Sequence, residues 1–176
     1  MNDNINNEAP NIRPSFAIYH ANAKGTGAAM KMTLHPAHDN MEGSIMLTII
    51  NQKTVGNGLG PNPTFPTFDW DNAATVKLCF DDLSRFLQVL RGECEEINEG
   101  KGIWHRSTVG VTVIKFHHTI DPICGYGLEL FRRKNGEDEE MRYRFFMTPS
   151  EALGICEAIT QAMMFVVFGV PTVINH

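Results

Sequence analysis

Residues 126–151 read YGLELFRRKNGEDEEMRYRFFMTPSE and decide the fold that the sequence predicts. Two strand-like stretches, 126–131 and 143–146, are separated by Asn135-Gly136, a dipeptide typical of tight β-hairpin turns. Directly after them, Thr148-Pro149-Ser150-Glu151 has the form of a helix capping box with proline at the first helical position. The sequence therefore predicts an antiparallel hairpin that leads at once into a helix, an order typical of α+β proteins.

The same order of elements occurs earlier in the chain. Residues 30–34, 45–50 and 76–80 read as strands, and a helix opens at Asp81-Asp82; the second copy begins with the strand 113–116. Residue identity between the copies is slight, so the repeat is one of pattern. We predict an α+β fold with a pseudo-duplicated strand-strand-strand(-strand)-helix unit, two antiparallel sheets and two helices.

The length of 176 residues fits one domain or two small fused halves. We expect a single domain over residues 15–176, built from two pseudo-repeats at about 15–100 and 101–170, after a flexible N-terminal tail over residues 1–14. The first dozen residues lack the basic and apolar regions of a signal peptide. The apolar run 163–170 is too short to span a membrane and is closed by Pro171. These features predict a soluble protein that is not secreted and has no membrane partner.

The cysteines form no Cys-x-x-Cys pair, which argues against a zinc knuckle and a redox motif. We expect all four to be reduced core thiols, namely Cys79, Cys94, Cys124 and Cys156. The predicted location is cytoplasmic, and nucleoid-associated if the source is a bacterium or a phage.

Two amphipathic helices are expected from the apolar spacing. The first has Asp81 as N-cap, ends near Asn98 and Gly100, and buries Leu83, Phe86, Leu87, Leu90, Cys94 and Ile97. The second buries Ala152, Ile155, Cys156, Ile159 and Met163. Beyond Ala162 the second helix is apolar on every side, which predicts burial in a homodimer or homotetramer. The expected subunit interface consists of Met163, Met164, Phe165, Val167 and Phe168.

The sequence contains none of the common catalytic motifs. A hydrolase elbow, a phosphate-binding loop, a dinucleotide fingerprint and a zinc-protease helix are all absent. Histidines are the remaining candidates for metal binding, but His117 and His118 are strand neighbours that point to opposite faces, so they cannot readily share one ion. We therefore predict a protein that is not an enzyme and has no catalytic residue, metal site or cofactor.

The formal net charge of −5 weighs against a nucleic-acid partner, because phosphate binding relies on Lys and Arg. The distribution of charge changes this view. Acidic residues gather in the stretches 93–99 and 137–140, whereas the predicted strands and their flanks carry Lys and Arg. A sheet can then be basic on an acidic protein, and its local field guides the ligand. The alternative is that these cations only make the strand faces soluble and contact water, not a ligand.

Single-stranded nucleic acid is bound by cations that follow the phosphates and by flat side chains on which bases stack. Lys24-Gly25-Thr26-Gly27 is expected to form a flexible turn whose glycines let backbone approach a ligand. Trp104-His105-Arg106-Ser107 combines a stacker, a titratable ring and a guanidinium, although Trp104 could also be a packed aromatic at the start of a strand. The predicted contact residues are Tyr19, Lys24, Lys31, Lys77, Lys101, Trp104, His105, Arg106, Lys115, His117 and Arg132.

The stretch 24–32, KGTGAAMKM, resembles the Lys-Gly-Lys-Ala-Ala-Leu strand of the plant Whirly proteins. The doubled order of strands and helix over residues 15–168 resembles that of the Whirly and transcriptional-coactivator p15 superfamily. The resemblance implies a single-stranded DNA-binding protein in which antiparallel sheets carry the strand and helices drive dimer or tetramer assembly. It implies DNA contacts at Lys24, Lys31, Lys77 and Lys115. Thr26-Gly27 replaces the second lysine of the plant motif, so this loop is less basic.

These observations predict a single-stranded DNA-binding protein with low sequence specificity. We expect it to act as a transcriptional regulator or as an accessory factor in replication or recombination. Two alternatives remain open at this stage. The same sheet could stack RNA bases, which would make the chain an RNA-binding module. The apolar second helix could instead define an oligomeric structural protein that binds no nucleic acid.

Overall fold

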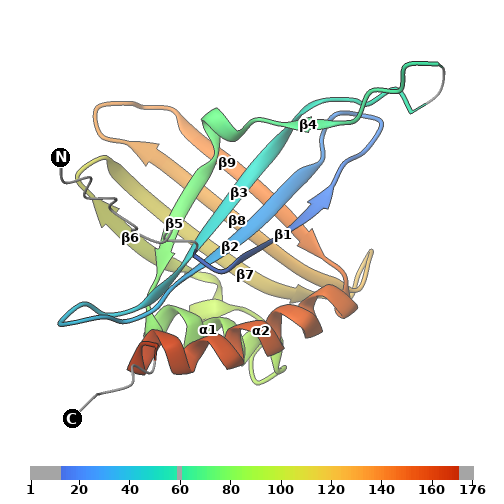
Figure 1. Cartoon of the computed structure of the whole chain (residues 1–176). Coiled ribbons are helices and arrows are strands. Elements are labelled where there is room, and N and C mark those ends of the chain that lie inside the picture. Colours follow the sequence, from blue (N-terminus) through green and yellow to red (C-terminus); the bar gives the residue numbers. More distant parts are fainter. Residues whose placement is uncertain (1–12, 59–60, 171–176) are drawn as a thin grey trace, which may run out of the picture.

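The computed structural model describes residues 13–58 and 61–170, in which two helices and nine strands form one body (Figure 1). The strands of the first half are β1 (Ser15–His20), β2 (Ala28–His35), β3 (Ser44–Thr54), β4 (Thr67–Phe68) and β5 (Ala74–Leu78), and they precede α1 (Phe80–Leu90). The second half has β6 (Ile103–Ser107), β7 (Gly110–Thr119), β8 (Gly125–Lys134) and β9 (Glu140–Met147), followed by α2 (Pro149–Phe168).

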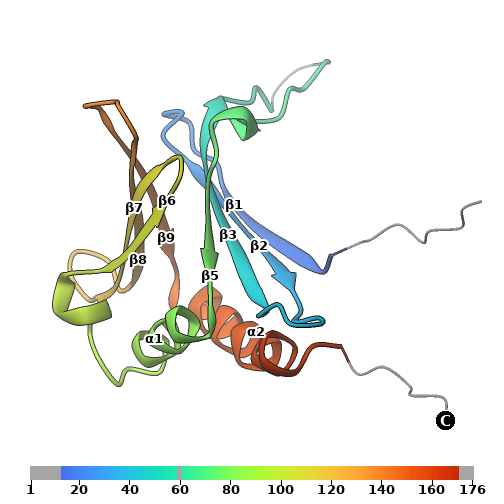
Figure 2. The ribbon, with the colours of Figure 1, turned by 90° about the vertical axis from the view of Figure 1, so that its left-hand side faces the viewer.

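Each half forms one antiparallel sheet. In the first sheet β2 lies between β1 and β3, and β3 also pairs with β5 and with the short β4. In the second sheet the order is β6-β7-β8-β9. Figure 2 shows the two sheets side by side with both helices beneath them. The predicted α+β architecture of two antiparallel sheets and two helices is therefore confirmed.

The core lies between the sheets and extends down to the helices. Alternating residues of both sheets meet there, among them Met30 and Leu47 from the first sheet and Leu128 from the second, all buried. Phe86 of α1 stacks on Phe116 of β7 with ring centroids 4.8 Å apart. The two halves thus share one hydrophobic core.

The first helix is shorter than predicted. It begins after Cys79, which takes the N-cap position in place of Asp81, and Asp82 accepts the Cys79 backbone N–H at 3.0 Å to complete a capping box. It ends at Leu90, because Gly92 adopts φ = 72°, a left-handed conformation typical of helix ends. Ile97 is buried as predicted, but from a separate 3₁₀ turn, Ile97–Gly100.

The second helix begins as predicted, with Thr148 as N-cap and Glu151 completing its capping box. Its predicted stripe Ala152, Ile155, Cys156 and Ile159 is buried. The last two turns are exposed in the single chain, Met164 at 60% and Phe168 at 75%, so their burial between subunits stays a prediction. By length and composition α2 could also cross a membrane, so the prediction that no apolar segment reaches that length is wrong. The reason is that the helix continues the apolar run N-terminally to Pro149.

Three smaller predictions meet mixed outcomes. The segment 102–119 contains two strands, β6 and β7, where the sequence analysis expected one strand around residues 113–116. Cys156 is buried as expected, but Cys124 is exposed because it lies in the β7–β8 connection and not on a core-facing strand position. Residues 1–12 of the predicted tail lie outside the described residues, and the Pro14 carbonyl accepts the Leu34 N–H at 2.8 Å.

Candidate nucleic-acid interface

Alternate residues of β6–β9 point away from the core. Ile114, Leu128 and Phe145 are buried on the inner side, so their strand neighbours lie on the outer side. We call this outer side the β6–β9 face (left-hand side of Figure 2). Its residues, placed by the strand register, are Trp104, Arg106, Val111, Val113, Lys115, His117, Thr119, Gly125, Gly127, Glu129, Phe131, Arg133, Glu140, Arg142, Arg144 and Phe146.

The β6–β9 face combines cations with aromatic rings. Trp104 lies on the edge strand β6 and is 70% exposed, so its ring is accessible to a partner. Phe131 has the Arg142 guanidinium 4.8 Å and the Lys115 Nζ 5.8 Å from its ring centroid, which are cation–π distances. Phe131 therefore holds two cations in place and is itself occupied.

A carboxylate in the middle of the face fixes two arginines. Glu129 Oε1 accepts from Arg142 at 2.6 Å and lies 3.2 Å from Arg144 Nε. Lys115 is its cross-strand neighbour. One carboxylate thus faces three cations, so this part of the surface keeps a positive charge on a protein that is negative overall.

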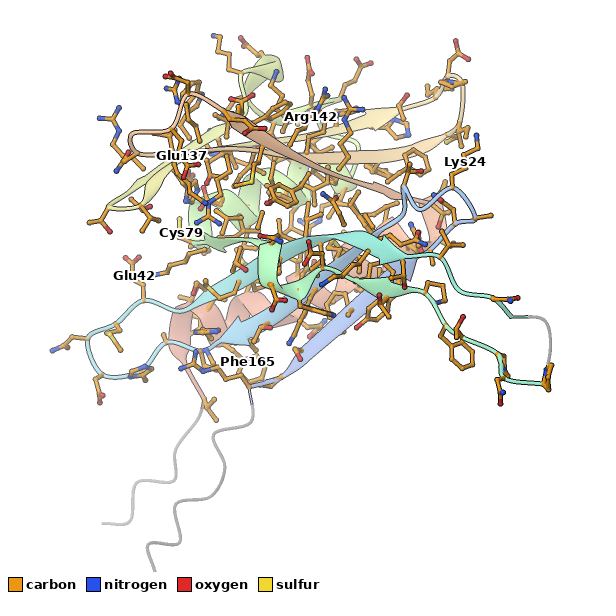
Figure 3. All side chains as sticks on the ribbon, turned by 90° about the horizontal axis from the view of Figure 1, so that it is seen from above. Lys24, Glu42, Cys79, Glu137, Arg142 and Phe165 are labelled. Atoms are coloured by element: carbon orange, nitrogen blue, oxygen red, sulfur yellow. The ribbon has the colours of Figure 1, made fainter. Side chains whose placement is uncertain are left out.

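The β1–β2 turn brings Lys24 to the same region, beside the strand ends of the second sheet (Figure 3). Two side-chain amides organise the turn. Asn22 Oδ1 accepts the backbone N–H groups of Lys24 at 3.0 Å and of Thr26 at 3.1 Å. The buried Gln52 Oε1 accepts those of Asn22 at 2.9 Å and of Gly27 at 3.1 Å. The close backbone approach predicted at Gly27 therefore serves the chain itself, since a side chain there would collide with Gln52 and the His20 carbonyl.

Two adjoining clefts separate the turn from the second sheet. The first has a volume of about 400 Å³ and is lined by His20, Asn22, Thr26, Gly27, Ala28, His117, Gly127, Leu128, Glu129, Arg144, Phe145 and Phe146. The second, of about 460 Å³, is lined by Gly25, Thr26, Gly27, Asn51, Arg142 and Arg144. Because Thr26, Gly27 and Arg144 line both, the clefts form one groove between the turn and β9.

The structure divides the predicted contact residues into groups. Trp104, Arg106, Lys115 and His117 lie together on the β6–β9 face, and the turn that carries Lys24 lies across the groove from β9. Tyr19, Lys31 and Lys77 lie on the outer face of the first sheet, which points away from the β6–β9 face. Lys101 precedes β6, with its Nζ 3.7 Å from Glu99. A single continuous surface therefore does not carry all the predicted residues.

His105 and Arg132 lie on the inner side of their strands, apart from this face. His105 Nε2 is 3.2 Å from Asp82 Oδ2, and the Cys79 thiol donates to the same oxygen at 3.1 Å. Burial opposes ionisation of Asp82, but the hydrogen bonds from His105 and Cys79 outweigh it and lower the pKa of this carboxyl. This cluster joins the start of α1 to β6. Arg132 is half-buried opposite Thr112 and Met141.

Sequence reasoning missed several residues of the face, namely Phe131, Arg133, Arg142, Arg144 and Phe146. A signal for the last three existed, since they alternate with Met141, Tyr143 and Phe145 along one strand. No local pattern pointed to Gln52 or Asn22. Among the described residues, no group of three or more His, Cys, Asp or Glu side chains is arranged to hold a metal ion.

No protein-family model matches this sequence, and no curated protein matches it either. Solved structures do resemble it. WHY3 from Arabidopsis thaliana has a TM-score of 0.69 at 14% identity, with 92% of each chain covered. The plant transcriptional regulator PBF-2 has a TM-score of 0.65 at 15% identity, covering 89% of this chain and 84% of that one. A guideRNA-binding protein complex bound to a gRNA has a TM-score of 0.58 at 18% identity, covering 88% and 92%. The chain thus has the Whirly-like fold that its sequence predicted.

Proposed function

We propose that this protein binds single-stranded DNA through the β6–β9 face, with low sequence specificity. The observation that carries the proposal is that Trp104 shares the β6–β9 face with the cations Lys115, Arg142 and Arg144. A groove lined by Arg142 and Arg144 separates this face from the β1–β2 turn, which carries Lys24. Cations that follow phosphates beside exposed rings are what sequence-tolerant binding of single strands requires.

The resemblance to known structures supports a nucleic-acid ligand. One similar structure is a plant transcriptional regulator and another is a guideRNA-binding complex bound to its RNA. We assign this chain a non-enzymatic role in transcription regulation, or as an accessory factor in replication or recombination. RNA is the second candidate ligand, favoured by the guideRNA-binding relative. The proposed location is the cytoplasm, with nucleoid association in a bacterium or phage.

Two matched double variants test which face binds. Arg106→Gln with Lys115→Gln removes two cations from the β6–β9 face, and Lys31→Gln with Lys77→Gln removes two from the outer face of the first sheet. Fluorescence anisotropy with single-stranded DNA, matched RNA and duplex DNA, each at about 50 mM and about 200 mM salt, reports affinity and salt dependence. The first variant should weaken single-strand binding severalfold and reduce the salt slope by about 0.7 for each lost phosphate contact. The second should stay close to the wild type.

The outcomes separate the candidates. Equal losses from both double variants would show that binding is not confined to the β6–β9 face. A preference for matched RNA over DNA would favour the RNA-binding alternative. A protein that binds none of the three, or binds duplex as well as single strands, would refute the proposed function and favour a structural role.

A further inference from the structure

Two glycines of β8 allow two aromatic rings to lie across the strand. Gly125 and Gly127 are two residues apart, so both point to the outer side of the second sheet. A Cβ atom at Gly127 would collide with the His117 ring, and one at Gly125 would collide with the ring of Phe146. The rings therefore occupy the space of the missing side chains. Each is only partly buried, so part of its surface remains accessible.

These rings line the floor of the first cleft, and the β1–β2 turn forms its wall. Asn22 and Thr26 contribute polar groups from the turn, which the hydrogen bonds to Gln52 and within the turn hold in place. The volume of about 400 Å³ lies within the range of small-ligand pockets. The cleft is therefore a preformed space with aromatic rings on one side and polar groups on the other.

Arg144 lines both this cleft and the next one, and Arg142 lines the next one. Glu129 engages one nitrogen of Arg142 and one of Arg144, which orients both guanidinium groups. A guanidinium carries five N–H donors, so each keeps donors for another acceptor. Phosphate oxygens match such donors in geometry and charge.

We propose that this cleft takes one nucleotide unit of the bound strand, with its base stacked on His117 and Phe146 and its phosphate bound by Arg142 and Arg144. The inference rests on the proposed single-strand binding and adds to it a defined place for one unstacked base. A base paired in a duplex would have to leave its stack to enter, which costs energy that an unpaired base does not pay. The cleft would thus contribute to the preference for single strands.

The experiment compares a base-bearing oligonucleotide with an abasic strand of equal length and charge. Phe146→Ala removes one ring. Gly127→Ala removes no ring but displaces that of His117, and the backbone at Gly127 is not left-handed, so alanine fits the strand. Phe65→Ala and Gly58→Ala are the matched controls, since Phe65 is exposed in the β3–β4 connection and a Cβ at Gly58 meets nothing within 4 Å. Circular dichroism and thermal unfolding establish that each variant folds.

We expect Phe146→Ala and Gly127→Ala each to lose about tenfold in affinity for the base-bearing strand, the order of one lost stacking contact. Their affinity for the abasic strand should equal that of the wild type, and the control variants should change neither affinity.

If either folded variant binds the base-bearing strand as the wild type does, or loses equal affinity for both strands, the cleft does not hold a base. A wild type that binds no single strand overturns the proposed function and this inference together. A wild type that binds base-bearing and abasic strands equally overturns only the inference.

Discussion

A single buried amide, that of Gln52, determines the shape of the β1–β2 turn. Besides accepting two backbone N–H groups, its Nε2 donates to the carbonyls of Asn22 and Thr54, both at 3.0 Å. The Oε1 atom thus accepts two hydrogen bonds and the Nε2 atom donates two, so the amide of this 8% exposed residue is fully paired. The amide thus replaces water for backbone groups that have no strand partner, and it indirectly holds Lys24 at the groove.

Replacing Gln52 with leucine should therefore be costly. Gln52→Leu leaves several buried backbone groups without partners, and we expect a loss of about 1–3 kcal/mol in the free energy of unfolding. Affinity for single-stranded DNA should also fall, because the turn that carries Lys24 loosens. Urea unfolding and anisotropy measure the two effects. Gln88→Leu on the exposed side of α1 is the matched control. An unchanged unfolding free energy would show that the turn holds itself without Gln52.

Three of the predicted contact residues, Trp104, Arg106 and Lys115, lie together on one side of the second sheet. Their contact with nucleic acid stays a prediction. His105 lies between two outward residues of β6, so strand alternation sends it inward to Asp82. The inward direction of His105 can be predicted only when the bounds of β6 are known. The apolar pattern did not reveal these bounds, because the glycine-containing segments on either side of β6 resemble loops. For the adjacent pair Arg132 and Arg133, only the strand register decides which one faces outward.

At the scale of elements, the start of α1 and strand β6 are joined through Asp82. Its lowered pKa means that the folded state prefers the ionised carboxylate. The resulting stability is fully present above the unfolded-state pKa of about 3.9 and is lost as the pH falls through the lower folded-state value. Asp82→Asn removes this contribution. The variant should be less stable than the wild type by about 1–3 kcal/mol near neutral pH.

The difference between Asp82→Asn and the wild type should shrink as the pH falls from about 4 through the lower folded-state pKa of Asp82, because both side chains are uncharged once the pH is below that value. Urea unfolding at a series of pH values measures it. Asp81→Asn is the control, because Asp81 pairs only with Arg85 on the helix surface, at 2.9 Å. A pH-independent difference would mean that Asp82 acts through hydrogen bonding alone and not through its charge.

Element boundaries were predictable where a local signal marks them. The capping box Thr148–Glu151 fixed the start of α2 to the residue. The end of α1 was not found, because Cys94 and Ile97 continue the apolar spacing beyond Gly92, and only tertiary packing shows that Ile97 reaches the core from a separate turn. A glycine two residues past the last helical turn was the stronger signal.

At the scale of the whole molecule, the direction in which each sheet face points depends on how the sheets pack, which no local pattern records. Lys31 and Lys115 occupy corresponding strands of the two halves, yet they point to different sides of the molecule. In both sheets the apolar side faces the shared core and the basic side faces outward. Because the core lies between the sheets, the two basic sides point in different directions. Two pseudo-repeats therefore give two candidate surfaces. The first carries Tyr19, and the second carries Trp104, Phe131, Phe146 and the groove.

The exposed end of α2 carries the last prediction, that this chain self-associates. Met164, Phe165, Val167 and Phe168 are exposed, and Val167 lines one hollow with Met41 and Phe80, which are exposed too. A second copy would bury these apolar side chains. Met164→Ser with Phe168→Ser should convert a dimer or tetramer into a monomer that keeps its circular dichroism spectrum. Leu153→Ser, at the other end of α2 and similarly exposed, should leave the assembly intact. Size-exclusion chromatography with light scattering measures the mass of each. A wild type that is monomeric at every concentration, or that binds lipid vesicles through α2, would contradict the assignment of this patch to a second copy.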